Sequence, residues 1–336
     1  MSLKNILGLG LCSLVLFTSQ MAHSDNTCGK VSLADMNWAS AEFAAYLDKI
    51  ILETGFDCKV SLVPSDTVPA ITSMTEKAEP DLASELWFNA NRDKIEAAIK
   101  ANKLKAVSNI LEDGGEEGWW IPQYFADAHP DIKTVEDALK HPELFPNPEN
   151  KKRGAFMGCP SGWGCQINTD NLFKAFKGKE AGFDLIDPGS AAGLDGSIAK
   201  AYERKQPWIG YYWAPTAILG KFPMYKLDFN VPYDDKMWQS CISKEDCVDP
   251  KPSAWAKSEV RTAVTVPFAE RAPKAVMDYL SKRTYKNDML NQILAWMDNE
   301  KADGEAGAMH FLKTQEPLWT TWVSPEVAEK IKAKIK

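Results

Sequence analysis

The chain has 336 residues, of which 45% are hydrophobic and 25% charged, and its formal net charge at pH 7 is −7. This acidic balance argues against binding to nucleic acid or to anionic membrane surfaces. The length is sufficient for two domains or lobes.

The N-terminal residues are typical of an export signal. Lys4 precedes a short apolar run over residues 6–17, and Ala22-His23-Ser24 fits a small-x-small cleavage site. The run is shorter than the roughly 20 apolar residues that a transmembrane helix needs. We therefore expect residues 1–24 to be a signal peptide cleaved near Ser24, and the mature protein to be periplasmic.

The cysteine count agrees with export. Cys12 lies in the expected signal peptide, and six of the seven cysteines remain, an even number that suits disulfides in an oxidising compartment. Position favours three pairs, because Cys28 and Cys58 each precede a strand-like run, and the other four cysteines form pairs six residues apart: Cys159 with Cys165 and Cys241 with Cys247. The remaining histidines lack metal-ligand spacing, so we expect neither a metal nor a cofactor.

The first third of the chain alternates strands and helices. The patterns predict strands over residues 31–34, 60–63 and 81–87, and helices over 40–54, 68–75 and 92–101, the first of them stopping at Gly55. This order is typical of an α/β fold with a parallel sheet and helices on both faces. Ligands bind such sheets beyond the carboxyl ends of the strands, where Trp38 and Trp87 lie.

A polar, glycine-rich stretch at residues 112–118 is the expected crossover into a second lobe. That lobe should hold a helix capped by Thr134 with Asp137 in a capping box, a helix near 197–204, and a strand over 207–213. We assign residues 25–118 to the first part of lobe 1, 119–221 to lobe 2, and 222–336 to the return into lobe 1. The return should contain amphipathic helices near 273–281 and 287–298, and a last helix that starts at Ser324-Pro325.

The segment Gly158-Cys159-Pro160-Ser161-Gly162-Trp163-Gly164-Cys165 is the most informative part of the chain. A bridge between its cysteines would close a tight ring, and its glycines let backbone N–H groups approach a ligand. We expect Asn168 or Thr169 to cap a following helix, whose N-terminus favours anions. The segment would thus offer an aromatic face to a cation and amides to an anion, although a stapled turn around a buried tryptophan explains it equally well.

Four of the 12 tryptophans lie at predicted strand ends or in the glycine-rich loop: Trp38, Trp87, Trp163 and Trp213. Indoles gathered at a ligand-facing edge can form a cage that holds a quaternary ammonium group by cation–π attraction. Trp119, Trp120, Tyr211 and Tyr212 are further candidates, and the remaining tryptophans are assigned to packing. Taken singly, each tryptophan is also explained by core or interface packing.

Three motifs resemble the substrate-binding proteins of glycine betaine/proline betaine ABC importers. The cysteine-bracketed tryptophan segment is similar to that family's disulfide-bridged loop, Glu85-Leu86-Trp87 to its first cage strand, and Tyr211-Tyr212-Trp213-Ala214-Pro215 to another cage segment. The residues from Asn37-Trp38 to Gly55-Phe56 also resemble the family's first strand and helix. The resemblance covers residues 29 to 300.

The resemblance implies a two-lobe periplasmic-binding-protein fold of type II, with the ligand in the cleft between the lobes. It implies that Trp87, Trp163 and Trp213 surround a trimethylammonium group, with Trp38 or Trp120 completing the cage. The amides of Gly164 and Cys165 would hold the ligand's carboxylate. Close relatives add a histidine to that subsite, and this chain has Asn91 there, whose amide still donates a hydrogen bond.

The resemblance also implies the ligand class and the partner. Choline-type relatives carry an aspartate two residues after the position of Trp38, and this chain has Ser40 there, which favours a ligand with its own carboxylate. Glycine betaine, proline betaine and dimethylsulfoniopropionate fit that description. The expected partners are this small zwitterion and an ABC transporter permease, without nucleic acid, and the expected oligomeric state is a monomer.

A secreted carbohydrate-active enzyme is the alternative. Tryptophans stack on sugars, and Glu85 with Glu116 or Glu117 provides the carboxylates that glycoside hydrolysis requires. Carboxylates at strand ends and turns are ordinarily solvated, and the sequence contains no hydrolase signature motif. We therefore expect a binding protein and not an enzyme.

Overall fold

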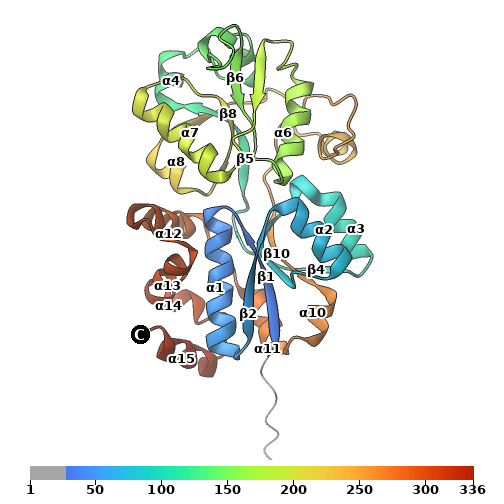
Figure 1. The fold of residues 1–336 in the computed structure, drawn as a ribbon, viewed down its shortest axis with the longest axis vertical. Coiled ribbons are helices and arrows are strands. Elements are labelled where there is room, and N and C mark those ends of the chain that lie inside the picture. Colours follow the sequence, from blue (N-terminus) through green and yellow to red (C-terminus); the bar gives the residue numbers. More distant parts are fainter. Residues whose placement is uncertain (1–27) are drawn as a thin grey trace, which may run out of the picture.

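The computed structural model describes residues 28–336 and shows two lobes, each built on a five-stranded sheet (Figure 1). The expected signal peptide, with Cys12, lies outside this range. The order of strands and helices confirms the predicted α/β class. Within residues 28–336, no helix combines the length and the apolar character needed to cross a membrane.

The sheet of the first lobe has the strand order β2-β1-β3-β10-β4. β1 pairs in parallel with β2 and β3, whereas β10 runs antiparallel between β3 and β4. The predicted parallel sheet is therefore confirmed for the first three strands, and a strand from much later in the chain completes it. The strands are β1 (Lys30–Met36), β2 (Lys59–Ser65), β3 (Leu82–Trp87), β4 (Leu104–Asn109) and β10 (Val260–Thr265).

Helices cover both sides of this sheet: α1 and the C-terminal helices lie on one side, and α2 and α3 on the other (Figure 1). The helices of this lobe are α1 (Ala39–Phe56), α2 (Thr67–Lys77), η1 (Asn89–Asn91), α3 (Arg92–Lys100), α10 (Val266–Arg271), α11 (Lys274–Lys282), α12 (Asn287–Glu300), α13 (Gly304–Thr314), α14 (Glu316–Trp319) and α15 (Pro325–Lys334). Ser324 caps α15 as predicted.

Helix α1 shows how packing overrides a local signal. Gly55 is the expected stop, yet the helix continues to Phe56 and ends at Asp57, which adopts a left-handed conformation with φ of 55°. A Cβ on Gly55 would lie 2.8 Å from a side-chain carbon of Val327 in α15. The glycine therefore provides close contact between two helices and does not end the first of them.

The second lobe has the strand order β7-β6-β8-β5-β9, with β6 parallel to β7 and β8, and β5 antiparallel to β8 and β9. Its strands are β5 (Glu116–Pro122), β6 (Gly154–Met157), β7 (Phe183–Ile186), β8 (Gly210–Ala214) and β9 (Met224–Lys226). Its helices are α4 (Gln123–Ala128), α5 (Val135–Leu139), η2 (Pro142–Leu144), α6 (Gly164–Ala175), α7 (Ala191–Arg204), α8 (Ala217–Lys221), α9 (Asp235–Met237) and η3 (Trp238–Ile242). Thr134 and Asp137 form the predicted capping box of α5.

The chain crosses between the sheets twice. The first crossing lies between β4 and β5, in the glycine-rich stretch expected to hold it. The second comes after β9, which still pairs with β5, so the return begins later than the expected boundary at residue 222. The two crossings pair with each other, because the N–H groups of Gly115 and Ser258 each donate to the other's carbonyl at 2.8 Å.

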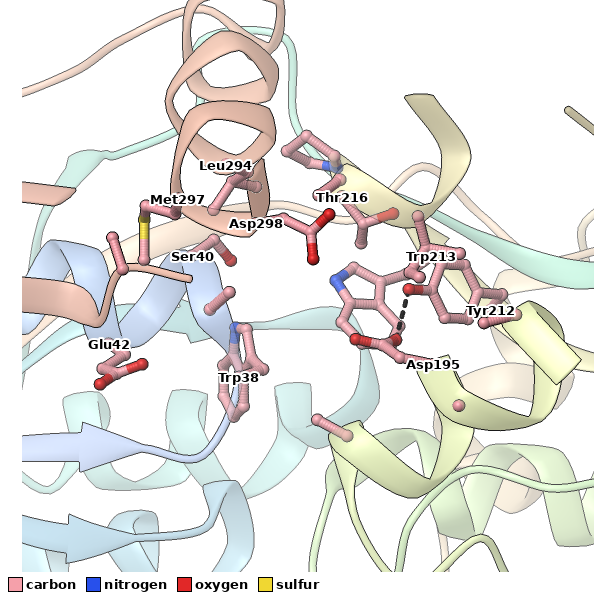
Figure 2. A pocket seen from close by; sticks show the side chains of 18 of the residues that line it. Trp38, Ser40, Glu42, Asp195, Tyr212, Trp213, Thr216, Leu294, Met297 and Asp298 are labelled. Carbon is pink, nitrogen blue, oxygen red and sulfur yellow. Dashed lines mark hydrogen bonds between the residues drawn. The ribbon is translucent and has the colours of Figure 1, made fainter. Parts of the chain in front are cut away.

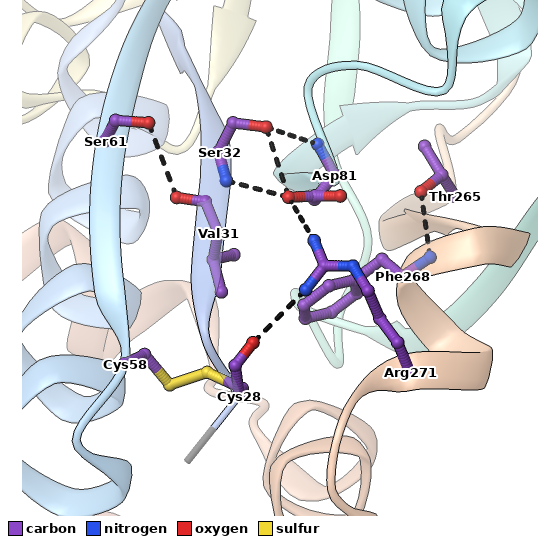
Figure 3. A network of polar contacts seen from close by, with 9 residues as sticks. All are labelled: Cys28, Val31, Ser32, Cys58, Ser61, Asp81, Thr265, Phe268 and Arg271. Atoms are coloured by element: carbon purple, nitrogen blue, oxygen red, sulfur yellow. Dashed lines mark hydrogen bonds and ion pairs between the residues drawn. A yellow bond between two sulfur atoms is a disulfide. The ribbon is translucent and has the colours of Figure 1, made fainter.

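Three disulfides join the cysteines as expected: Cys28 with Cys58, Cys159 with Cys165, and Cys241 with Cys247. The first bridge lies where β1 and β2 start, beside a polar network (Figure 3). There Arg271 pairs with Asp81 at 2.7 Å and donates to the carbonyl of Cys28 at 3.2 Å. This network holds the start of the described chain against the first sheet. It lies where the strands begin, at the opposite end from Trp38 and Trp87.

Candidate functional site

Four tryptophans line one cavity between the lobes, and they are the four that the sequence singles out. Trp38 follows β1 and Trp87 ends β3 in the first lobe, while Trp163 precedes α6 and Trp213 lies on β8 in the second. We call these four side chains the cage. The rings contact edge to face, with centroids 5.0 Å apart for Trp38 and Trp163, and 5.1 Å for Trp163 and Trp213. The cavity they leave is about 30 Å³.

A buried glutamate holds the two indoles of the first lobe. One carboxylate oxygen of Glu85 accepts hydrogen bonds from the ring N–H groups of Trp38 at 2.8 Å and Trp87 at 2.9 Å. The same oxygen accepts a bond from the hydroxyl of Ser40 at 2.9 Å. Only 1% of Glu85 is exposed, and burial raises the pKa of its carboxyl. Glu85 and Trp87 point to the same side of β3 because side chains alternate along a strand.

A second buried glutamate lies on the other lobe's side of the cavity. Glu117 of β5 lines the cavity and is the register partner of Trp213 on β8. Its carboxylate accepts hydrogen bonds from the phenol of Tyr211 at 2.9 Å and from the hydroxyl of Ser258. Burial raises the pKa of this carboxyl as well. The expectation that these carboxylates are solvated is therefore wrong for Glu85 and Glu117, and holds only for the exposed Glu116.

Helix α6 begins earlier than expected. It starts at Gly164 with Trp163 at the cap position, so the expected caps Asn168 and Thr169 are buried inside the helix. No side chain caps α6, which leaves its first-turn N–H groups, including those of Gly164 and Cys165, for another acceptor. The disulfide between Cys159 and Cys165 closes the loop onto this first turn, which explains why the helix starts there.

Asn91 of η1 lies against this helix start from the opposite lobe. A Cβ on Gly164 would come within 2.1 Å of the Asn91 side-chain nitrogen, so only glycine permits this approach. The Asn91 side chain is 4% exposed, and its nitrogen has no hydrogen-bond partner among residues 28–336. Gly164, Cys165 and Asn91 all line the same cavity as the cage. Unused N–H donors thus gather beside the four indoles.

Contacts between the lobes hold the tryptophan loop in place. The ring N–H of Trp163 donates to the side-chain oxygen of Asn37 at 2.7 Å. The backbone N–H of Val68 in α2 donates to the carbonyl of Gly162 at 3.2 Å. Both partners of the loop belong to the first lobe, so closing the lobes positions Trp163.

The further aromatic candidates divide according to the pleat of β8. Tyr211 and Trp213 lie on one face, their rings stacked at 6.3 Å, and Tyr211 lines the cavity. Tyr212 faces the other way and donates to Asp195 at 2.6 Å.

Trp119 is fully buried in the second lobe, and Trp120 donates its ring N–H to the Tyr212 carbonyl. Trp38, and not Trp120, is therefore the fourth indole of the cavity.

A larger cavity of about 480 Å³ adjoins the cage (Figure 2). Trp38 and Trp213 line both cavities and separate them. Figure 2 shows the carboxylates of Asp195 and Asp298 pointing toward this space, with Leu294 and Met297 above it on α12. Burial raises the pKa of Asp195 to about 6.

A protein family and several solved structures match this chain. The family described as the substrate binding domain of ABC-type glycine betaine transport systems matches residues 29–314. An ABC-transporter choline binding protein in complex with choline has a TM-score of 0.72 at 19% identity, covering 92% of this chain and 99% of that one.

Two more solved structures share the fold. A glycine betaine, L-proline ABC transporter binding protein (ProX) from Borrelia burgdorferi has a TM-score of 0.71 at 15% identity, covering 90% of this chain and 99% of that one. Lactococcal OpuAC, in its closed-liganded conformation complexed with glycine betaine, has a TM-score of 0.65 at 17% identity, covering 88% and 100%. These likenesses confirm the two-lobe periplasmic-binding-protein fold.

The family consists of transporter binding proteins, so the carbohydrate-active enzyme is ruled out as an alternative. Its match extends over most of the chain and includes every residue of the cage. The chain therefore belongs to the substrate-binding domains of ABC-type glycine betaine transport systems.

Proposed function

We propose that this protein captures a betaine-type zwitterion, such as glycine betaine, proline betaine or dimethylsulfoniopropionate, between its two lobes. Trp38, Trp87, Trp163 and Trp213 hold the onium group, and the amides of Gly164 and Cys165 hold the carboxylate. One observation carries the proposal: unused N–H donors lie beside four indoles in one buried space. This combination matches a ligand that carries a positive and a negative group close together.

Asn91 completes the carboxylate subsite in this proposal. Its buried side-chain nitrogen has no partner among the described residues, and such a donor is costly unless a ligand satisfies it. Ser40 does not take the role that an aspartate has in choline-type relatives, because its hydroxyl donates to Glu85. Both features favour a ligand with a carboxylate over a simple alcohol such as choline.

The lobes close over the ligand and open to release it. Two cage indoles belong to each lobe, and their rings are in edge contact when the lobes are together. A cation is held best when ring faces lie within about 6 Å of it. The cavity of about 30 Å³ is too small for a trimethylammonium group, so the lobes part to admit the ligand and then close until the ring faces contact it.

The protein delivers its ligand to an ABC permease from outside the cytoplasm. Family membership and three disulfides support this setting. We propose that residues 1–24 direct export to the periplasm and are cleaved near Ser24, and that the protein acts as a monomer.

A thermal-shift screen of onium compounds, followed by calorimetric titration, tests the proposal. A betaine at 100 times its Kd should stabilise the protein by roughly 2.7 kcal/mol. Choline lacks the carboxylate, and 3,3-dimethylbutanoate has carbon in place of the ammonium nitrogen, so both should bind more weakly than glycine betaine. Equal binding of all three, or no binding of any betaine or sulfonium zwitterion, would contradict the proposal.

A further inference from the structure

The chain holds the cage indoles with two different kinds of acceptor. Trp163 donates its ring N–H to the neutral amide oxygen of Asn37, whereas Trp38 and Trp87 donate to the carboxylate of Glu85. A neutral acceptor therefore suffices to orient an indole in this protein. Burying a carboxylate is much more costly than burying an amide, so the charge of Glu85 calls for a reason beyond orientation.

The surroundings of Glu85 neutralise its charge only in part. Arg283 is the nearby cation and is fully buried, but it already forms an ion pair with Asp48 at 2.8 Å. The phenol of Tyr285 is the other titratable group that faces Glu85. The second carboxylate oxygen of Glu85 is buried and has no hydrogen-bond partner among residues 28–336. The hydrogen-bonded oxygen is the one that accepts from both indoles, so the charge of the carboxylate lies at their N–H edges.

Glu117 lies on the second lobe's side of the cavity, and its carboxylate accepts from a phenol and a hydroxyl, not from an indole. It lines the cavity directly and is bonded to Tyr211, whose ring stacks on Trp213. Lys226 is the nearest cation, and it pairs with Glu116 at 2.8 Å. The residues that line the cavity include no lysine, arginine or histidine within the described part of the chain.

We propose that Glu85 and Glu117 are the anionic backing of the cage, one from each lobe, which makes the site select ligands by positive charge and not only by shape. The inference rests on the proposed function. Glu85 accepts two indole N–H bonds, so its charge lies at the ring edges and enriches the ring faces that a cation contacts, whereas Glu117 lines the cavity and acts on the cation directly. The neutral Asn37 cannot do this for Trp163. Glu85 and Glu117 are thus positioning and selectivity residues, and the indoles remain the ligand contacts.

Charge selectivity gives a direct test. We would titrate glycine betaine and its uncharged-head analogue 3,3-dimethylbutanoate into the wild type, Glu85→Gln and Glu117→Gln. Glutamine keeps the size of the side chain and an oxygen that accepts the same donors. Glu116→Gln is the matched control, because it removes the same charge one residue from Glu117 on an exposed side chain.

In both buried variants we expect the preference for glycine betaine over the analogue to fall about tenfold or more, which corresponds to about 1.4 kcal/mol. The control should keep its preference within about twofold, because an exposed charge is screened by solvent. A ratio of affinities is insensitive to a general loss of folded protein, and thermal unfolding without ligand checks folding separately.

Proton release provides a second readout that a purely structural role would not change. Burial raises the pKa of both carboxyls, and a permanent cation bound beside them favours their ionised forms. Binding of glycine betaine should therefore release protons, measured by calorimetry in buffers of different ionisation enthalpy, and each glutamine variant should release fewer. Glycine betaine itself has no group that titrates near neutral pH.

The outcomes separate the two proposals. If the wild type binds no onium compound, the proposed function fails. If the wild type binds glycine betaine, but both glutamine variants keep its charge preference and proton release, the carboxylates only pack the site and this inference is overturned.

Discussion

The sequence marks the positions of the cage tryptophans, but it does not mark the residues that support them. Each cage tryptophan lies in or just after the end of a strand or sits in the glycine-rich loop, and these positions are at the ligand edge of the sheets. Glu85 and Glu117 read as ordinary strand carboxylates, because nothing local shows that a residue 141 positions away, Ser258, donates to Glu117. Tyr211 could have been predicted as a cavity residue from the alternation of side chains along residues 210–214. Tyr211 lies on the same face of the strand as Trp213, and Tyr212 lies on the other face.

Trp163→Ala should weaken glycine betaine binding by about 30-fold or more, since one desolvated cation–π contact contributes roughly 2 kcal/mol. Trp163 also links the lobes through Asn37, so its loss removes a contact of the closed form. Calorimetric titration measures the effect.

Trp296→Ala is the control for this substitution. Trp296 stacks on His310 with centroids 3.9 Å apart, on the outer helices of the first lobe. Its loss should lower the melting temperature and leave the Kd unchanged. Wild-type affinity in Trp163→Ala would show that the cage does not bind the cation.

Asp195→Asn should change how stability depends on pH. Burial raises the pKa of Asp195 from 3.8 to about 6, so the folded protein binds a proton more readily than the unfolded chain. Stability due to this group is therefore present below pH 4 and is lost as pH rises toward 6. Asparagine removes that loss. Between pH 4 and 7, the free energy of unfolding of the variant should therefore rise relative to that of the wild type by at most about 3 kcal/mol.

Urea unfolding without ligand, at several pH values, measures this gain. Tyr212 can still donate to the asparagine oxygen, so the hydrogen bond is not the variable. A stability difference between the two proteins that stays constant from pH 4 to 7 would show that Asp195 has an ordinary pKa.

Helix ends were predictable where a side chain caps them. Thr134 with Asp137 and Ser324 with Pro325 carry their capping pattern in the sequence, and the structure has helices at both places. The start of α6 was not predictable in this way, because it has no capping side chain and is defined by the disulfide ring. The late return from the second sheet was also missed, since the three-residue strand β9 is too short to show a periodicity.

Gly164→Ala should block lobe closure without unfolding either lobe. The added methyl would lie 2.1 Å from the Asn91 nitrogen and 2.7 Å from Ala90, and both belong to the opposite lobe. We expect glycine betaine affinity to fall by 100-fold or more, on the order of 3 kcal/mol. Alanine suits the first turn of a helix, so the unliganded melting temperature should not decrease.

Gly196→Ala is the matched control on another helix of the same lobe. A Cβ at Gly196 meets nothing within 4 Å. It should stabilise the protein by about 0.5–1 kcal/mol, because glycine is a poor helix residue, and leave the affinity unchanged. Tight binding by Gly164→Ala would mean that Gly164 does not approach Asn91 in the liganded protein.

The chain passes between the lobes at one narrow place. Both crossings meet where Gly115 pairs with Ser258, and we expect the lobes to rotate about this pair. Gly115 lies in the crossover expected at residues 112–118, while the return boundary expected at residue 222 lies between α8 and β9 of the second lobe. Ion pairs on both flanks of the cleft, Lys221 with Asp298 and Lys94 with Glu245, connect the lobes in the closed arrangement.

Saturating glycine betaine should therefore reduce the radius of gyration measured by small-angle X-ray scattering. Gly164→Ala should remain at the larger radius under the same conditions, because its added methyl group prevents the lobes from meeting. Scattering curves of the wild type that coincide with and without ligand would show that the pocket is preformed and that binding does not involve hinge motion.

The division of the cage between two lobes also has a kinetic consequence. In an open molecule, an arriving ligand meets only Trp38 and Trp87 or only Trp163 and Trp213, so capture begins at half a site and its rate is set by encounter. We expect escape to require the lobes to part first, so residence time should follow the opening rate and be similar for ligands that hold the lobes equally well. A permease that pulls the lobes apart would thus release the ligand without rearranging any single side chain.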